Sequence, residues 1–129
     1  TVSDKTVISE TLQSFGNDIE ALYVPTDNNI ASAMGSVDIF ATEYKIPVIC
    51  GESNAVSNGG LASLGVDYYQ IGYQTGEMAV KLLKGEAKIS ELAIGHQEKI
   101  DVFYNSKSAE KIGISLPERI LNEGEDVAK

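Results

Sequence analysis

Short apolar runs alternate along the chain with longer segments in which apolar residues recur every three to four positions. The short runs have the length of buried strands, and the longer segments have helical periodicity. The strand-like runs are 21–24, 46–50, 61–66 and 100–104. The helical segments are 6–16, 30–45, 67–84, 106–112 and 117–121. Strands that alternate with helices predict right-handed βαβ crossovers, and therefore an α/β fold with a mainly parallel sheet.

Capping residues mark several of the predicted helix ends. Ser3 or Asp4 suits the start of the first helix, and Ser53 or Asn54 suits a short helical turn after the second strand. Ser106 is the expected cap of the helix at 106–112. Residues 123–129 are expected to form a frayed tail, and residues 85–99 a polar connection.

Composition bounds the class of protein. A chain of 129 residues with 43% hydrophobic residues is the size of one globular domain. Its net charge of −9 argues against nucleic acid as a partner and disfavours anionic membrane surfaces.

The common catalytic and cofactor signatures do not occur. There is no GxGxxG after a strand, no GxxxxGK[ST] and no GxSxG. One histidine, His96, and one cysteine, Cys50, argue against a metal site by count, and no cofactor is expected. Cys50 lies in the apolar run 46–50, which predicts a buried, unreactive thiol. The sequence therefore indicates a protein that is not an enzyme.

Three polar clusters each follow an apolar strand. They are Thr26, Asp27 and Asn28; Glu52, Ser53 and Asn54; and Asp67 and Tyr68. In a parallel sheet the three clusters lie along one edge, where open α/β sheets bind ligands. Carboxylates could pair with a ligand ammonium group, and Tyr68 could stack on an apolar part. Local helix capping explains each cluster equally well when it is taken singly.

Longer stretches of the chain resemble one known family. Ala-Leu-Tyr-Val-Pro-Thr-Asp-Asn-Asn-Ile-Ala-Ser-Ala-Met, Lys-Ile-Pro-Val-Ile-Cys-Gly-Glu and Gly-Val-Asp-Tyr-Tyr-Gln-Ile-Gly-Tyr-Gln-Thr-Gly are similar to segments of ABC-transporter substrate-binding proteins of the tryptophan/tyrosine type. The resemblance implies a solute-binding component of an importer with a periplasmic-binding-protein-like fold. Such proteins have two three-layer, Rossmann-like lobes that close on a small ligand, and an aromatic amino acid is one candidate ligand.

The resemblance also implies a place for this chain in such a protein. Asp27, Glu52 and the Asp67–Tyr68 pair are expected to face the cleft between the lobes. Members act outside the cytoplasm, either lipid-anchored or periplasmic, and deliver the solute to a membrane permease. Since the match covers less than half of a usual member, we expect residues 1–129 to be one α/β unit from its C-terminal part. Residues 67–99 are then expected to pack on the first lobe, and the isolated chain to self-associate through helix 67–84.

Two other functions share this pattern of strands and helices. One is the effector-sensing domain of a transcription regulator, which a basic helix-turn-helix would accompany. The other is a small flavodoxin-like or receiver-type enzyme domain, which needs a phosphate loop or an acidic pocket at the first strand. Neither feature occurs in the sequence.

Overall fold

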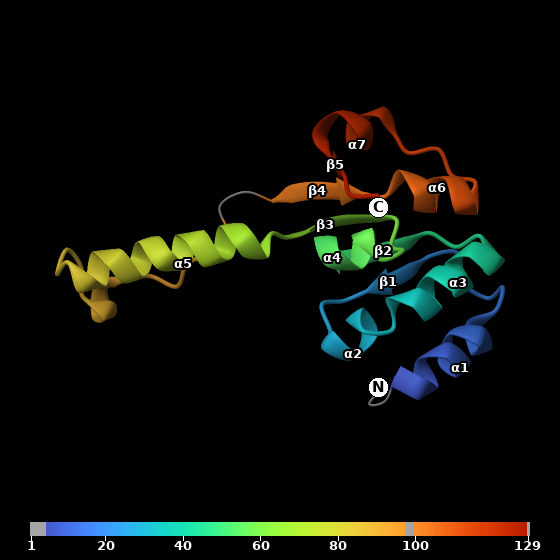
Figure 1. The fold of residues 1–129 in the computed structure, drawn as a ribbon, viewed down its shortest axis with the longest axis horizontal. Helices are drawn as coiled ribbons and strands as arrows, with labels where there is room; N and C mark the ends of the chain where they lie inside the picture. The colour runs from blue at the N-terminus through green and yellow to red at the C-terminus, as the bar shows by residue number, and fades with distance from the viewer. Residues whose placement is uncertain (1–4, 98–99, 129) are drawn as a thin grey trace.

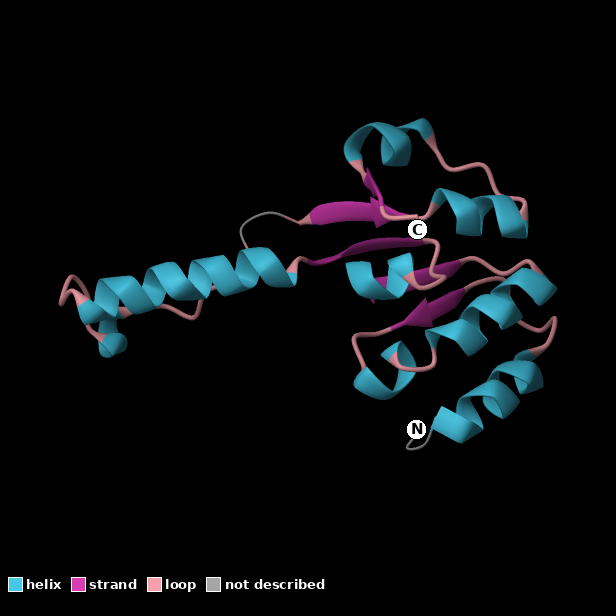
Figure 2. Ribbon diagram, viewed as in Figure 1, coloured by secondary structure: helices cyan, strands magenta, loops and turns pink. Residues whose placement is uncertain are grey.

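The computed structural model describes residues 5–97 and 100–128, and these form a five-stranded sheet with helices (Figures 1 and 2). The sheet order is β1-β2-β3-β4-β5. The strands are β1 (Leu22–Val24), β2 (Val48–Glu52), β3 (Ala62–Val66), β4 (Asp101–Tyr104) and β5 (Glu125–Asp126). The α-helices are α1 (Lys5–Phe15), α2 (Asn28–Ala31), α3 (Met34–Tyr44), α4 (Ser53–Ser57), α5 (Tyr68–Leu83), α6 (Ser106–Ile112) and α7 (Glu118–Glu123), with a 3-10 turn, η1 (Ile89–Glu91).

The sheet is mainly parallel, as the sequence predicts. β1, β2 and β3 run parallel to one another, and β5 runs parallel to β4. β4 pairs with β3 in the antiparallel sense. The reason is the long connection between the two strands. α5 begins at the carboxyl end of β3, and the segment after α5 folds back along this helix toward the same end of β3 (Figure 1). β4 therefore enters the sheet where β3 leaves it.

The main core lies on one face of the sheet, beneath α1 and α3. Val24, Val48 and Cys50 point from the strands toward Val37 and Phe40 of α3, and all five are almost fully buried. Burying each of these aliphatic or aromatic side chains contributes about 1.5–3 kcal/mol. Lys111 of α6 also reaches Asp38 of α3, with Nζ 2.7 Å from Oδ2. α1, α3 and α6 therefore lie side by side on this face of the sheet.

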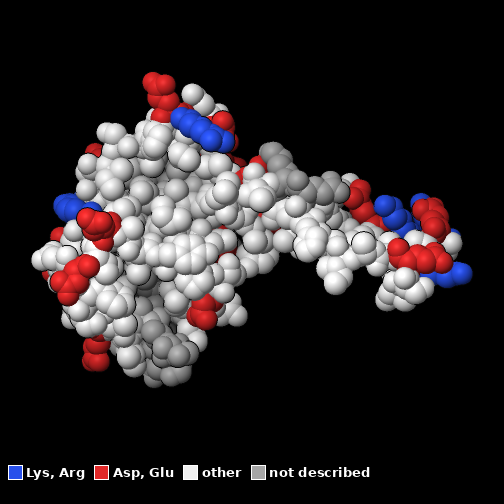
Figure 3. Space-filling model, turned by 180° about the vertical axis from the view of Figure 1, so that it is seen from behind, with Lys and Arg blue, Asp and Glu red and all other residues white. Residues whose placement is uncertain are grey.

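The other face of the sheet is largely open. Tyr23, Ile49 and Leu64 alternate with the core residues along their strands and point away from them, and Tyr23 and Leu64 are 66% and 69% exposed. On this side the end of α7 approaches β4, where a Cβ added to Gly124 would lie 3.0 Å from the Tyr104 ring. Figure 3 shows the reverse side of the molecule, with charged side chains mainly toward the rim. Within residues 5–97 and 100–128, the third layer of the predicted fold is therefore present only beside β4.

The predicted helix at 30–45 is two helices. Asp27 caps a single turn, α2, and Ser32 then donates its hydroxyl to the Asn29 carbonyl at 2.8 Å. Ala33 has non-helical backbone angles and precedes α3. Polar side chains that bond to nearby backbone compete with helix continuation. The break turns α3 so that Met34 and Val37 enter the core.

Three further details differ from the sequence prediction. β2 extends through Glu52, so Glu52 and not Ser53 or Asn54 occupies the N-cap position of α4. Asn105, not Ser106, caps α6. The predicted frayed tail contains β5, which is held to the sheet by the Val127 N–H donating to the Tyr104 carbonyl at 2.8 Å. Ser3 and Asp4, the predicted caps of the first helix, lie outside the described residues.

Asn105 joins the sheet to two helices, which explains why it is a better cap than Ser106. It is buried, its Oδ1 accepts from the Ser108 N–H at 3.0 Å, and its Nδ2 donates to the Val56 carbonyl at 2.9 Å. Asn105→Ala removes the cap and leaves the Val56 carbonyl without this donor. We expect a loss of about 3 kcal/mol in the free energy of unfolding, measured by urea denaturation.

Asn122→Ala is the control, because Asn122 is exposed on α7. This variant is expected to change the free energy of unfolding by less than about 0.5 kcal/mol. Equal effects of the two substitutions would contradict the role given to Asn105.

Candidate functional site

The three polar clusters lie at one edge of the sheet. β1, β2 and β3 are parallel, with Val24 opposite Cys50 and Glu52 opposite Val66. Their carboxyl ends therefore meet at the same edge. Along this edge lie three polar clusters, each at the carboxyl end of one strand: Thr26 to Asn28 after β1, Glu52 with Ser53 at the end of β2, and Asp67 with Tyr68 after β3.

Two glycines bring these strand ends into close contact. A Cβ on Gly51 would lie 2.9 Å from Thr26 Oγ1 and 3.1 Å from the Thr26 nitrogen. A Cβ on Gly65 would collide with the Ser63 hydroxyl and with the Gly51 carbonyl. The register shifts between Cys50 and Glu52, which marks an irregularity at this point of β2. Only glycine at positions 51 and 65 allows the ends of the three strands to approach this closely.

Asp27 and Asp67 both cap helices. Asp27 Oδ1 accepts from the backbone N–H groups of Asn29 at 2.9 Å and Ile30 at 3.1 Å. Asp67 Oδ1 accepts from Tyr69 at 2.8 Å and Gln70 at 3.3 Å. Within the described residues, Oδ2 of each carboxylate has no hydrogen bond. Each side chain can therefore cap its helix and present a second oxygen at the sheet edge.

Glu52 is different, because it performs no such structural task. It is 8% exposed, and its side chain makes no capping hydrogen bond to α4. Nor does its carboxylate make a hydrogen bond or ion pair with any part of the chain that the structure describes. Its oxygens keep some contact with solvent, since among the described residues the fully buried side-chain polar atom without a partner is the Ser63 hydroxyl. Of the three predicted carboxylates, Glu52 is thus the one that capping does not explain.

The remaining predicted residues surround these carboxylates with different degrees of exposure. Tyr68 begins α5 and is half exposed, Ser53 begins α4, and Asn28 begins α2. Thr26 packs against Gly51. The site is thus an open edge of carboxylates, hydroxyls and an aromatic ring.

Sequence reasoning missed two polar side chains near this edge. Ser63 is 2% exposed, and its hydroxyl has no hydrogen-bond partner in the described structure. Gln97 reaches Asp67 and Gly65 from the far end of the polar connection. Nothing in the local sequence marks Gln97, because its partners are 30 and 32 positions away.

The described residues contain no group of three or more histidine, cysteine, aspartate or glutamate side chains placed to hold a metal ion. A search of the same residues for a helix long and apolar enough to cross a bilayer finds none. The chemistry present at the sheet edge is that of hydrogen bonding, charge pairing and aromatic contact.

The sequence belongs to the ABC transporter substrate binding protein family, whose family model matches residues 1–128. It is 36% identical over 104 residues to the tyrosine-binding protein of Clostridioides difficile, an alignment that covers 81% of this chain and 30% of that protein. The family consists of proteins that bind substrates and do not catalyse reactions. The resemblance seen in the sequence is therefore confirmed, as is the prediction that the protein is not an enzyme.

Solved structures of similar proteins confirm the α/β fold. A ligand-free, open substrate-binding protein with adhesive properties from Clostridium difficile has 36% identity and a TM-score of 0.80, with 99% of this chain and 42% of that chain covered. An ABC domain from Streptococcus pneumonia in complex with L-Trp has 32% identity and a TM-score of 0.81, with 97% and 42% covered. The chain thus spans less than half the length of these relatives.

The reactivity of the Cys50 thiol tests whether the end of β2, next to Glu52, is buried. Cys50 is 2% exposed, and burial, with the negative charge of Glu52, raises the pKa of its thiol to about 12 from the usual 9.0. Because the thiolate is the reactive form, we expect no labelling of the native protein by a thiol reagent at pH 8 and full labelling in urea. The raised pKa also predicts that stability is unaffected by this thiol below pH 9 and falls as the pH rises from 9 toward 12. Rapid labelling in the native state would contradict the burial of Cys50, and a free energy of unfolding that stays constant from pH 9 to 12 in urea denaturation would contradict its raised pKa.

Proposed function

We propose that this chain is the C-terminal part of a solute-binding protein of an ABC importer, and that it contributes one wall of the ligand site. The observation that carries the proposal is Glu52, a largely buried residue whose carboxylate has no partner in the described chain, between two capping aspartates at one sheet edge. A ligand with an ammonium group would supply the missing partner. Membership of the substrate-binding family supports the same conclusion.

An aromatic amino acid is the ligand class we favour. One relative is named for tyrosine and another was solved with L-Trp. In this chain, Glu52 and the free oxygens of Asp27 and Asp67 can accept from the ligand ammonium group. Tyr68 can stack on the ligand ring, while Thr26, Asn28 and Ser53 can donate or accept hydrogen bonds around it.

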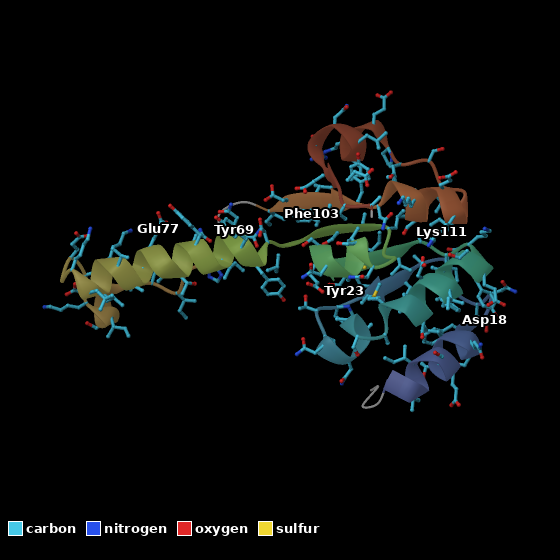
Figure 4. All side chains as sticks on the ribbon, viewed as in Figure 1. Asp18, Tyr23, Tyr69, Glu77, Phe103 and Lys111 are labelled. Atoms are coloured by element: carbon cyan, nitrogen blue, oxygen red, sulfur yellow. The ribbon has the colours of Figure 1, made fainter. Side chains whose placement is uncertain are left out.

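The rest of the site belongs, in this proposal, to a first lobe. The chain covers 42% of the solved relatives, and α5 carries no buried residue over its sixteen positions. Figure 4 shows Tyr69 and Glu77 on the part of this helix that extends beyond the sheet. We infer that residues 67–99 pack on the first lobe of the complete protein.

The cellular location and the partner of the complete protein follow from the same proposal. Substrate-binding proteins of ABC importers are extracytoplasmic, and we propose the same location here. The complete protein is then either lipid-anchored at the cell surface or periplasmic. The partner is then a membrane permease that receives the solute. The family match favours this role over an effector-sensing domain of a transcription regulator.

Calorimetry against the twenty amino acids tests the proposal on a protein that carries this chain together with its first lobe. We expect tyrosine or tryptophan to bind, and Glu52→Gln to weaken that binding at least tenfold, because the amide removes the charge that pairs with the ammonium group. The chain of 129 residues alone is expected to bind weakly or not at all, since the contacts from the first lobe that would enclose the ligand are absent.

Glu118→Gln is the matched control, because Glu118 is an exposed carboxylate in the first turn of α7. It is expected to leave the affinity unchanged. If no amino acid binds, or if Glu52→Gln binds as tightly as the unchanged protein, the proposed site is wrong.

We also propose that the isolated 129-residue chain self-associates through α5. Its accessible surface is 8552 Å², whereas a compact monomer of 13.8 kDa exposes about 6,600 Å². The difference of roughly 1,900 Å² is of the size that one partner contributes to a large, obligate interface. Tyr69, Tyr73 and Leu83 are among the exposed side chains of α5.

Light scattering of the isolated chain is therefore expected to give the mass of a dimer. Tyr73→Glu combined with Leu83→Glu is expected to return a monomer, because the added charges would have to be buried. Ile39→Glu with Val7→Glu adds the same charge at exposed apolar positions on α3 and α1, away from α5 and its return segment, and is expected to leave the dimer intact. A monodisperse monomer of the unchanged chain would contradict the proposal.

A further inference from the structure

Gln97 connects the two points at which the chain passes between the sheet and α5. Its Oε1 accepts from the Asp67 N–H at 3.1 Å, and its Nε2 donates to the Gly65 carbonyl at 3.4 Å. Asp67 is where the chain leaves β3 for α5, and Gln97 is where it returns toward β4. We call these two hydrogen bonds the Gln97 bridge.

The two hydrogen bonds of the Gln97 bridge have the pattern that one residue of a neighbouring parallel strand would make. In a parallel ladder, a residue of one strand donates to the carbonyl before its neighbour and accepts from the N–H after it. The primary amide of Gln97 does this around Val66, with the carbonyl of Gly65 and the N–H of Asp67. The regular β3–β4 pairing ends at Gly65 opposite Asp101. The side chain therefore adds pairing to β3 beyond the end of its ladder.

Little else in the described chain ties α5 to the sheet. None of its residues is buried, and the segment that folds back lies against α5 itself, with Gly95 beside Met78. Ile71, Met78 and His96 line a groove of about 400 Å³ between the two. α5 and its return segment thus form an arm (residues 68–97) whose contacts are mostly internal. The direction of the arm depends on its junction with β3.

We propose that Gln97 is a positioning residue that sets the direction of the arm relative to the sheet. Asp67 is held from both sides: Gln97 accepts from its N–H, while its own carboxylate accepts from Tyr69 and Gln70. The Gln97 bridge thereby places Asp67 and Tyr68 at the sheet edge beside Glu52. The link to ligand binding rests on the function proposed above, whereas the link to arm direction does not.

Gln97→Met tests this inference, because methionine has a similar length and shape but lacks both hydrogen-bonding groups. We expect hydrogen exchange of the Asp67 amide to become about tenfold faster, since a net hydrogen bond of ordinary strength is lost. Residual dipolar couplings of α5 amides, measured in the monomeric Tyr73→Glu, Leu83→Glu background and fitted with the alignment of β1 to β3, should then agree much less well than in the same background with Gln97. Exchange of amides in α3 should stay the same, which shows that the fold is retained.

Two further variants separate the parts of the bridge. Gln97→Glu keeps an oxygen that accepts from Asp67 but loses the donor to Gly65, so Asp67 should stay protected while the dipolar couplings change in part. Gln70→Met is the matched control, because Gln70 is an exposed glutamine in the first turn of α5. It should match the unchanged protein in both measurements.

The inference is overturned if Gln97→Met leaves both the Asp67 exchange rate and the α5 couplings unchanged, or if Gln70→Met changes them equally. Both measurements are made without ligand, so they decide the role of Gln97 even if calorimetry finds no ligand. Where an amino acid does bind, Gln97→Met should weaken binding, and Gln97→Glu should restore part of the affinity.

Discussion

The close approach of three parallel strand ends is the constraint on which the candidate site depends. Gly51 lies against Thr26, and Gly65 lies against the Gly51 carbonyl, so a side chain at either glycine would force the ends of β1, β2 and β3 apart. This contact brings three polar clusters from distant parts of the chain to one edge. Every chemical property proposed for the site follows from that proximity.

Within the edge, the three carboxylates differ in how far capping and the proposed ligand contact fall on the same side chain. Asp27 and Asp67 use one oxygen each to cap a helix, which holds the other oxygen in a fixed direction. Glu52 makes no capping hydrogen bond, and the residue as a whole is largely buried. A site that holds its charged groups in place before the ligand arrives loses less entropy on binding. Helix capping and ligand contact are therefore compatible uses of the same residues.

The surfaces that the fold leaves open are consistent with a part of a larger assembly. In the part of the chain that the structure describes, the sheet face with Tyr23 and Leu64 is covered only beside β4, and the arm extends away from the sheet. Relatives of known structure are more than twice as long as the aligned chain. The same exposed surfaces support both the proposed contact with a first lobe and the self-association of the isolated chain.

Local pattern in the sequence was enough to predict the alternation of strands and helices, the burial of Cys50 and the shared edge of Asp27, Glu52 and Asp67. These features depend on short apolar runs and on residues that follow them directly. Tertiary structure alone decided the break before α3, the cap by Asn105, the pairing of β5 and the Gln97 bridge. Each of these depends on partners distant along the chain, as with Asn105 and the Val56 carbonyl, or on a choice among adjacent polar residues that packing settles. No local periodicity encodes such choices, because their energy comes from contacts that exist only once the sheet has formed.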